Sequence, residues 1–195
     1  MKNFNIDSKA STIIENQLEK EKEKKILEIG PGIGYFNKGE RELRKNEFYI
    51  GLEIDPDNLD TIKTVINAQK KMNEIKNKTL IINGDGENIP LNTESIDEII
   101  PSNVLGDGNI EEEKKIKIIK DCKRVLKSKG KIIITETITP NDSKDSVNNI
   151  KEDQDFEEID MITGEGVKEY DKNPGNFFLT TEEKGESFVI TFQKK

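Results

Sequence analysis

Residues 25–36 read KILEIGPGIGYF, an apolar run that ends beside a carboxylate and is followed by three alternate glycines. The run at 25–29 predicts a buried strand. Glycines at 30, 32 and 34 predict a sharp turn in which the backbone can approach a ligand closely. Three interpretations compete for this turn: a phosphate-binding loop, a structural strand-to-helix turn without a ligand, and a pocket for another cofactor.

The spacing of the glycines disfavours phosphate binding. A dinucleotide-binding turn has the pattern G-x-G-x-x-G, with the pyrophosphate at the N-terminus of the following helix. Here the third glycine, Gly34, comes one position early, and Tyr35 stands where that pattern needs glycine. The Gly-Lys-Ser/Thr ending of a P-loop is absent as well.

Short apolar runs alternate with longer amphipathic stretches, which is typical of an α/β fold with a mainly parallel sheet. Strands are predicted at 25–29, 48–54, 79–83, 95–100 and 131–138. Most of these runs are continuously apolar, as expected for strands that are covered by helices on both faces. We expect one domain that spans residues 1–195.

Two of the helices between these strands have clear start signals. Asp55 and Pro56 are typical of an N-cap and a first helical position. Asn109 with Glu112 resembles a capping box at the start of the helix before the fifth strand. Cys122 lies on the apolar face of that helix, so we interpret it as a packing residue.

The two ends of the chain have weaker patterns. A helix near 9–22 rests on few apolar positions. Residues 140–175 are polar, acidic and poorly periodic, which predicts a variable lid or substrate-contact segment with one short helix around 154–161. The segments 177–183 and 187–193 predict a closing antiparallel hairpin.

Composition excludes several kinds of chemistry. The 195 residues carry a net charge of −8 without a basic stripe, so a nucleic-acid partner is disfavoured. The chain has no histidine, which excludes a Ser-His-Asp or Cys-His nucleophile and a His-ligated zinc site, and no metal site is predicted. A polar N-terminus and the lack of a membrane-length apolar run lead us to expect a cytoplasmic protein without a membrane partner.

Two carboxylates follow later strands at positions where an α/β sheet binds ligands. Glu53 ends the second strand, about 20 residues beyond the glycines, where an acidic side chain can accept hydrogen bonds from both hydroxyls of a ribose. Asp85 follows the third strand and can accept from an exocyclic amine such as adenine N6, while Gly86 lets a backbone N–H reach the ring. The glycine turn and these two carboxylates together indicate a pocket for an adenosyl group.

In this order the motifs resemble those of class I S-adenosylmethionine-dependent methyltransferases. LEIGPGIGYF resembles the glycine-rich first motif of that family, GLEIDPDNLD its second-strand acidic motif, and GDGENIPLNTESIDEII its adenine-side motif. CKRVLKSKGKIIITE resembles the helix, turn and fifth strand that follow. The resemblance covers roughly residues 12–138. It implies a Rossmann-like three-layer α/β sandwich whose seven-stranded, mostly parallel sheet ends in a C-terminal antiparallel hairpin.

The resemblance also implies how S-adenosyl-L-methionine would be held. Glu28 and the backbone of the glycine turn would hold the methionine moiety, Glu53 the ribose, and Asp85 with Gly86 the adenine, with Ile54 in apolar contact with the base. Ser102 and Asn103 would lie beside the sulfonium and the acceptor, although a plain loop-forming pair is an equal interpretation. The full set of implied cofactor residues is Glu28, Gly30, Pro31, Gly32, Gly34, Glu53, Ile54, Asp85, Gly86, Ser102 and Asn103.

The acceptor and any general base stay open at this stage. Candidate catalytic residues are Ser102, Asn103, Glu136 and Tyr170, and none is preferred. We expect methyl transfer by in-line displacement to a small molecule or a peptide, with residues 1–12 and 140–175 selecting the acceptor. The alternatives are a non-catalytic cofactor-binding or interaction protein that keeps the fold, and an aminopropyl-type transferase.

Overall fold

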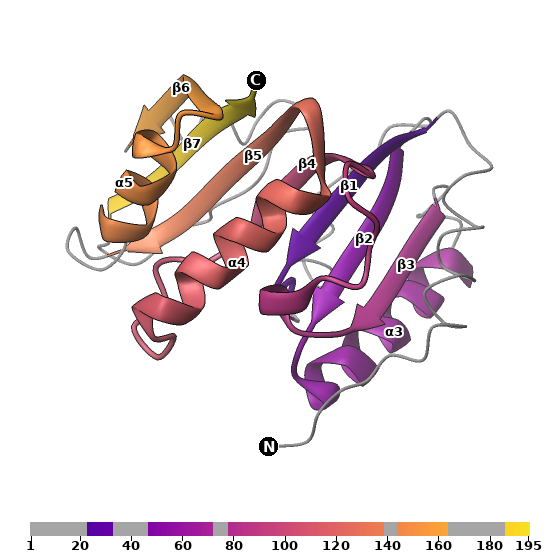
Figure 1. Cartoon of the computed structure of the whole chain (residues 1–195). Coiled ribbons are helices and arrows are strands. Elements are labelled where there is room, and N and C mark those ends of the chain that lie inside the picture. The colour runs from indigo at the N-terminus through magenta and orange to yellow at the C-terminus, as the bar shows by residue number, and fades with distance from the viewer. Residues whose placement is uncertain (1–22, 33–46, 72–77, 139–143, 164–185) are drawn as a thin grey trace.

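A computed structural model describes residues 23–32, 47–71, 78–138, 144–163 and 186–195 (Figure 1). These residues form a sheet with the strand order β3-β2-β1-β4-β5-β7-β6. The strands are β1 (Lys24–Ile29), β2 (Glu47–Glu53), β3 (Lys78–Asn83), β4 (Ile96–Pro101), β5 (Leu126–Ile138), β6 (Phe156–Thr163) and β7 (Glu186–Lys194). The predicted mostly parallel, seven-stranded sheet is confirmed.

The direction of the strands places the ligand-binding edge. Strands β3, β2, β1, β4 and β5 pair in parallel, whereas β7 runs antiparallel to both β5 and β6. Strand order reverses at β1, because β2 and β3 lie on one side of it and β4 and β5 on the other. Crevices at the carboxyl ends of strands beside such a reversal are where open α/β sheets bind their ligands.

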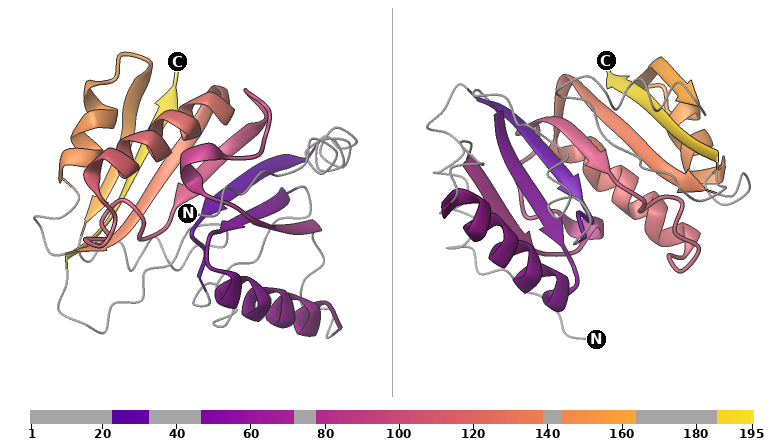
Figure 2. Two further views of the ribbon diagram at one scale, coloured as in Figure 1. Left: turned by 60° about the horizontal axis from the view of Figure 1, so that its bottom comes forward. Right: turned by 180° about the vertical axis from the view of Figure 1, so that it is seen from behind.

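Helices cover both faces of the sheet, as the two views of Figure 2 show. Helix α3 (Pro56–Lys71) lies over β2 and β3 on one face, and α4 (Glu112–Val125) with α5 (Lys144–Glu152) lies on the other. A short 3-10 helix, η1 (Gly86–Asn88), packs against α4. The predicted helix after Asp55 is therefore confirmed, whereas the helix expected at 9–22 falls outside the described residues.

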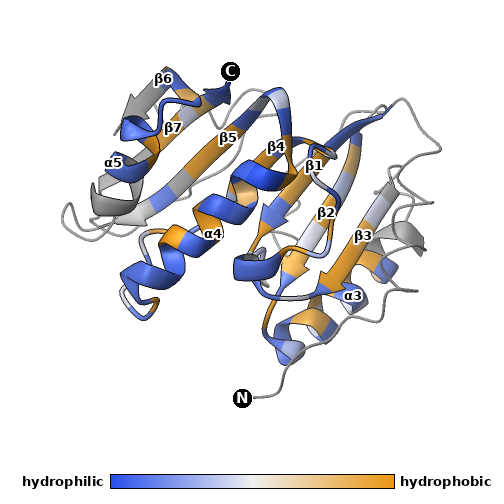
Figure 3. Ribbon diagram, viewed as in Figure 1, coloured by the Kyte–Doolittle hydropathy of each residue, from blue (hydrophilic) through white to orange (hydrophobic). Residues whose placement is uncertain are grey.

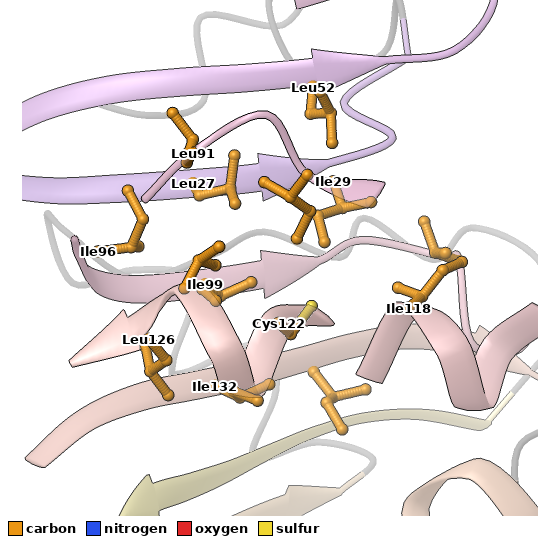
Figure 4. Packing of buried hydrophobic residues seen from close by; sticks show 14 of the residues in the cluster. Leu27, Ile29, Leu52, Leu91, Ile96, Ile99, Ile118, Cys122, Leu126 and Ile132 are labelled. Atoms are coloured by element: carbon orange, nitrogen blue, oxygen red, sulfur yellow. The ribbon is translucent and has the colours of Figure 1, made fainter. Parts of the chain in front are cut away.

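The larger core lies between the sheet and α4 (Figure 4). Alternate residues of the central strands point to this face, among them Leu27 and Ile29 of β1 and Ile132 of β5. Helix α4 contributes Ile118 and Cys122, and its outer surface is mainly hydrophilic (Figure 3). A second cluster on the α3 face joins Tyr49 to Ile62 and Ile66. Both faces of the central strands are thus buried, which explains their continuously apolar sequences.

Cys122 is a packing residue, as predicted. Its side chain is 2% exposed and lies in the larger core. Burial, with the nearby Asp121 carboxylate, raises the pKa of the Cys122 thiol. The reactive thiolate form is therefore disfavoured.

The prediction for the start of α4 is wrong. The helix begins at Glu112 after Glu111, whose side chain makes no capping hydrogen bond. Asn109 instead donates from its backbone N and its Nδ2 to Oδ1 of Asp107, at 2.8 and 2.9 Å. Asp107 thereby organises a turn that precedes the helix, and this local bond competes with a capping box.

The prediction for residues 154–161 is also wrong. The helix in this region is α5, which ends at Glu152, and residues 156–163 form the edge strand β6. Only Phe156 is buried among the first residues of β6, and a bulge between Glu158 and Asp160 interrupts the alternation of its side chains. A two-residue period is therefore absent from the sequence. The antiparallel partner of β7 is β6, and the strand predicted at 177–183 lies outside the described residues.

No helix within the described ranges is long and apolar enough to cross a membrane.

Candidate functional site

The turn after β1 has the conformation that its glycines predict. Gly30 and Gly32 have φ angles of +66° and +53°, in the region that side chains other than glycine rarely adopt. A Cβ on Gly30 would lie 2.8 Å from Cγ2 of Val104, whereas a Cβ on Gly32 would meet no atom of the described residues within 4 Å. The loop after β4 therefore fills the space beside Gly30, whereas the space beside Gly32 is open. Gly34 lies outside the described residues.

Glu53 lies directly beside this turn. Its side chain is 4% exposed at the end of β2, and its two oxygens accept hydrogen bonds from different backbone groups. Oε2 accepts from the N–H of Gly32 at 3.1 Å, and Oε1 accepts from the N–H of Asp55 at 2.9 Å. Because each carboxylate oxygen can accept more than one hydrogen bond, Glu53 retains capacity for a ligand hydroxyl. The glycine turn and this carboxylate, predicted separately, form one unit.

Glu28 of β1 is bound to a side chain on the α3 face of the sheet. It is 1% exposed and accepts a short hydrogen bond from the hydroxyl of Tyr49, which is fully buried under α3. Tyr49 was not identified from the sequence, because a tyrosine in a buried strand is typical of packing. Its hydroxyl orients a carboxylate two residues before the turn.

Asp85 and Gly86 form the third part of the site. Asp85 Oδ1 accepts from the N–H of Glu87 at 3.0 Å and caps η1, while its Oδ2 lies 3.8 Å from Nζ of Lys114. A Cβ on Gly86 would lie 3.2 Å from Ile29 and 3.3 Å from Ile118, so this glycine lets η1 pack closely between β1 and α4.

The ends of β2 and β3 are tied together near these residues. Gly84 N and Asn83 Nδ2 both donate to the carbonyl oxygen of Glu53, each at 3.0 Å. Ile54, the next residue, is 50% exposed although it is large and apolar. An exposed isoleucine beside a buried carboxylate could contact the flat apolar face of a ligand.

Two residues that the sequence did not single out hold the segment after η1. Asp121 on α4 accepts from the N–H of Ile89 at 2.6 Å, and Arg124 donates to the carbonyls of Ile89 and Leu91 at 2.8 Å each. Arg124 Nε also donates to Asp121 Oδ1 at 2.6 Å, and this hydrogen bond raises the pKa of the guanidinium. The i, i+3 spacing of Asp121 and Arg124 on α4 predicts an ion pair between them. It does not predict their bonds to the segment after η1, because the partners there are backbone groups.

The loop after β4, residues 102–107, lies against the glycine turn; we call it the β4 loop. The N–H of Ser102 approaches the carbonyl oxygen of Ile29 at 3.4 Å, and Asn103 is exposed with a φ angle of +50°. Val104 and Leu105 are buried. The structure thus brings the predicted pair, Ser102 and Asn103, to the carboxyl end of β1.

Glu136 lies behind the β4 loop. It is 1% exposed at the end of β5, and its Oε1 accepts from the N–H of Leu105 at 2.9 Å. Burial raises the pKa of Glu136 to about 7, while the backbone N–H groups of Leu105, Gly106 and Val104 and the charge of Lys115 act in the opposite direction. Tyr170, the other ionisable candidate, lies outside the described residues.

No group of three or more His, Cys, Asp or Glu side chains in the described parts of the chain could hold a metal ion. The groups that converge here and could bind a ligand are backbone N–H groups, carboxylates and one exposed apolar side chain.

Comparisons with known proteins show the family and the fold of this chain. A family model described as a methyltransferase domain matches residues 27–134, more than half of the chain. A demethylmenaquinone methyltransferase from Thermotoga maritima is 34% identical over 82 residues. That match covers 40% of this chain and 34% of the enzyme, so it spans about a third of the relative's length.

Solved structures share the whole fold at low identity. A SAM-dependent methyltransferase from Methanosarcina mazei has a TM-score of 0.63 at 17% identity, over 93% of this chain and 96% of that one. A SAM-dependent methyltransferase from Aquifex aeolicus has a TM-score of 0.58 at 14% identity, over 93% and 88%. These likenesses show that the fold is the same.

Proposed function

Because the chain belongs to the methyltransferase domain family, in the class I S-adenosyl-L-methionine-dependent superfamily, we propose that it transfers a methyl group to a small-molecule or peptide acceptor. It is a methyltransferase, and its cofactor is S-adenosyl-L-methionine. The kind of acceptor and the roles of single residues below are the proposal.

The assignment of the site rests on one observation: Glu53 accepts a hydrogen bond from Gly32, the glycine of the turn that has open space beside it. Gly32 has a left-handed backbone that glycine favours, and among the described residues its missing side chain leaves open space at the carboxyl edge of the sheet. The carboxylate that borders this space is buried and held by two backbone N–H groups, which fix its orientation before a ligand arrives. A preorganised acceptor of this kind binds ribose hydroxyls at low entropic cost.

The residues present fit the three parts of the cofactor. Glu53 would accept from the ribose hydroxyls, Asp85 from the amino group of adenine, and Ile54 would contact the base. The backbone at Gly30–Gly32 and the carboxylate of Glu28 would hold the methionine end. When bound, the cofactor supplies an electrophilic methyl group on a sulfonium.

The protein's own contribution to the reaction is alignment and the exclusion of water. In an in-line displacement the acceptor atom, the methyl carbon and the leaving sulfur must lie on one line, so positioning supplies much of the rate enhancement. Ser102 and Asn103, at the carboxyl end of β1, would border the acceptor. A base is needed only for acceptors that lose a proton.

The acceptor is proposed on charge and on the relative's chemistry. The net charge of −8 disfavours a nucleic acid, because phosphate binding depends on clustered cations. The relative that matches part of the chain is named for the methylation of demethylmenaquinone, which is not a nucleic acid. We propose that residues 1–12 and 140–175 select the acceptor. Within the second range, residues 144–163 form α5 and β6, whereas the other residues of both ranges lie outside the described residues.

Binding calorimetry tests the proposed site. We expect the wild type to bind S-adenosyl-L-methionine and S-adenosylhomocysteine, and Glu53→Ala or Asp85→Ala to weaken both at least tenfold, because each loses a charge-assisted hydrogen bond of about 1.5–3 kcal/mol. Asp60→Ala, which removes an exposed carboxylate from α3, should bind like the wild type.

Two other outcomes would redirect the proposal. If neither ligand binds to the wild type, the assignment of the site is wrong. If both bind but no acceptor in a panel of small molecules and peptides is methylated, a non-catalytic cofactor-binding role gains support. An aminopropyl transferase would instead prefer the decarboxylated cofactor.

A further inference from the structure

We propose that Glu136 is a positioning residue whose carboxylate holds the β4 loop against the glycine turn and thereby couples its own ionisation to cofactor affinity. The inference rests on the proposed function and extends it to a residue that does not touch the cofactor. It also replaces the interpretation of Glu136 as a general base.

The first observation is the way in which the carboxylate is buried. Glu136 continues the row of Ile132 and Ile134 on the α4 face of β5, and it is the only carboxylate of these three positions. Its Oε1 accepts from the N–H of Leu105 in the β4 loop at 2.9 Å, and the N–H groups of the neighbouring Val104 and Gly106 also favour its charged form. A carboxylate that accepts from a backbone N–H holds a loop irrespective of the loop's side chains.

The second observation is what the held loop touches. Val104 packs so closely on the turn after β1 that a Cβ on Gly30 would lie 2.8 Å from it. The N–H of Ser102 approaches the carbonyl of Ile29 in the same turn. The β4 loop therefore lies between Glu136 on one side and the glycine turn on the other. A loop released from Glu136 would lose its alignment with the turn.

Ionisation changes this contact because a hydrogen bond to a charged carboxylate is stronger than one to a neutral carboxyl. In the ionised form the bond from the Leu105 N–H to Oε1 is charge-assisted, and protonation of Glu136 removes that charge and weakens the bond. The charged group that faces Glu136 from α4 is Lys115, which is 4% exposed and lies 3.9 Å from Oε2 of Glu112. Asp107, at the end of the loop, is engaged by Asn109.

Two measurements test the coupling, the first without any cofactor. In NMR spectra the amide resonances of Val104, Leu105 and Gly106 should shift together with a midpoint near neutral pH in the wild type and stay constant in Glu136→Gln. Lys115→Met, which keeps Glu136, should move the midpoint to higher pH because it removes the neighbouring cation. This second variant serves if Glu136→Gln does not fold.

The second measurement is calorimetry with S-adenosylhomocysteine. The wild type should bind about fivefold more tightly at pH 8 than at pH 6, the lower end of typical coupling between two sites, and should release protons on binding. Glu136→Gln should bind with the same affinity at both pH values. Glu98→Gln, which neutralises a buried carboxylate on β4 that accepts from Lys24, should keep the wild-type profile.

The outcomes separate this inference from the proposed function. Loop amides that do not titrate, or that titrate equally in Glu136→Gln, overturn the inference. Equal wild-type affinity at pH 6 and pH 8 overturns it too, while the methyltransferase assignment survives. A wild type that binds no S-adenosylhomocysteine at any pH contradicts the proposed function itself.

Discussion

At the scale of single residues, three carboxylates at one edge of the sheet differ through their surroundings. Glu53 borders open space, Asp85 is partly exposed, and Glu136 is enclosed by the loop that it holds. The first two could be predicted because they follow apolar runs whose ends are visible in the sequence. The task of Glu136 could not be predicted, because its partners are backbone N–H groups, which every residue except proline has.

The two glycines of the first turn should respond differently to alanine. Gly32→Ala should cost about 1–2 kcal/mol of unfolding free energy, the penalty for a side chain in a left-handed conformation, because no atom of the described residues obstructs its Cβ. Gly30→Ala should cost more, since its Cβ would also displace Val104. Urea denaturation at constant pH measures both.

Gly108→Ala is the matched control for these variants. Gly108 has no positive φ angle and an added Cβ would meet nothing within 4 Å, so its stability should stay within about 0.5 kcal/mol of the wild type. Equal losses for Gly30→Ala and Gly32→Ala would show that the contact with Val104 is unimportant.

At the scale of elements, the strands of the central sheet were predictable and β6 was not. The central strands are buried on both faces, so almost every residue is apolar and the run itself is the signal. Strand β6 is an edge strand with a bulge, and most of its described side chains face water. It pairs with β7 through backbone hydrogen bonds, and the sequence of β6 has no two-residue period that would have predicted this pairing.

Helix α4 does more at this scale than cover the sheet. Arg124→Ala should lower the unfolding free energy by about 1.5–3 kcal/mol and weaken cofactor binding several-fold, because it frees the carbonyls of Ile89 and Leu91 beside the proposed adenine side of the site. Urea denaturation and calorimetry measure the two effects. Lys120→Ala, at an exposed position of the same helix, should change neither.

Arg124→Lys separates charge from geometry. A lysine keeps the positive charge, but it cannot reach two carbonyls and Asp121 at once as the guanidinium does. It should therefore resemble the alanine variant. Full retention of stability and affinity in Arg124→Lys would contradict the role assigned to the fork geometry.

At the scale of the whole molecule, Glu136 should make folding stability depend on pH. Its pKa is raised from 4.5 to about 7 in the folded protein, chiefly by burial, so the folded state holds the proton more tightly than the unfolded chain. The stability that this provides is complete below about pH 4.5 and is lost as pH rises through 7. The total loss is about 3 kcal/mol, most of it between about pH 5 and pH 8.

The difference between wild type and Glu136→Gln isolates this term from the other carboxylates. Unfolding free energies of both proteins should be measured by urea at several pH values between about 5 and 8. Relative to Glu136→Gln, the wild type should become progressively less stable with rising pH. A constant difference across this range would show that Glu136 titrates normally in the folded protein.

The overall topology could be predicted further than the site. The alternation of apolar runs and amphipathic stretches indicates a parallel α/β sheet, and the reversal of strand order at β1 then places the ligand edge. Glu53 and Gly32 could both be named from their positions, but not the bond between them. Such bonds depend on register, which is settled only when the strands are side by side.

The loops at the ligand edge are held by their main chain, and this has a consequence for how the acceptor pocket could change. The side chain of Glu136 holds the β4 loop by a hydrogen bond to a backbone amide. Arg124 and Asp121 hold the segment after η1 by hydrogen bonds to its backbone amide and carbonyl groups. Side chains such as Ser102 can then be exchanged without disturbing the anchors. Substitutions on the loop surface should therefore change the acceptor without changing how the methyl donor is bound. A directed-evolution library confined to the loop surface should retain its fold while its substrates diverge.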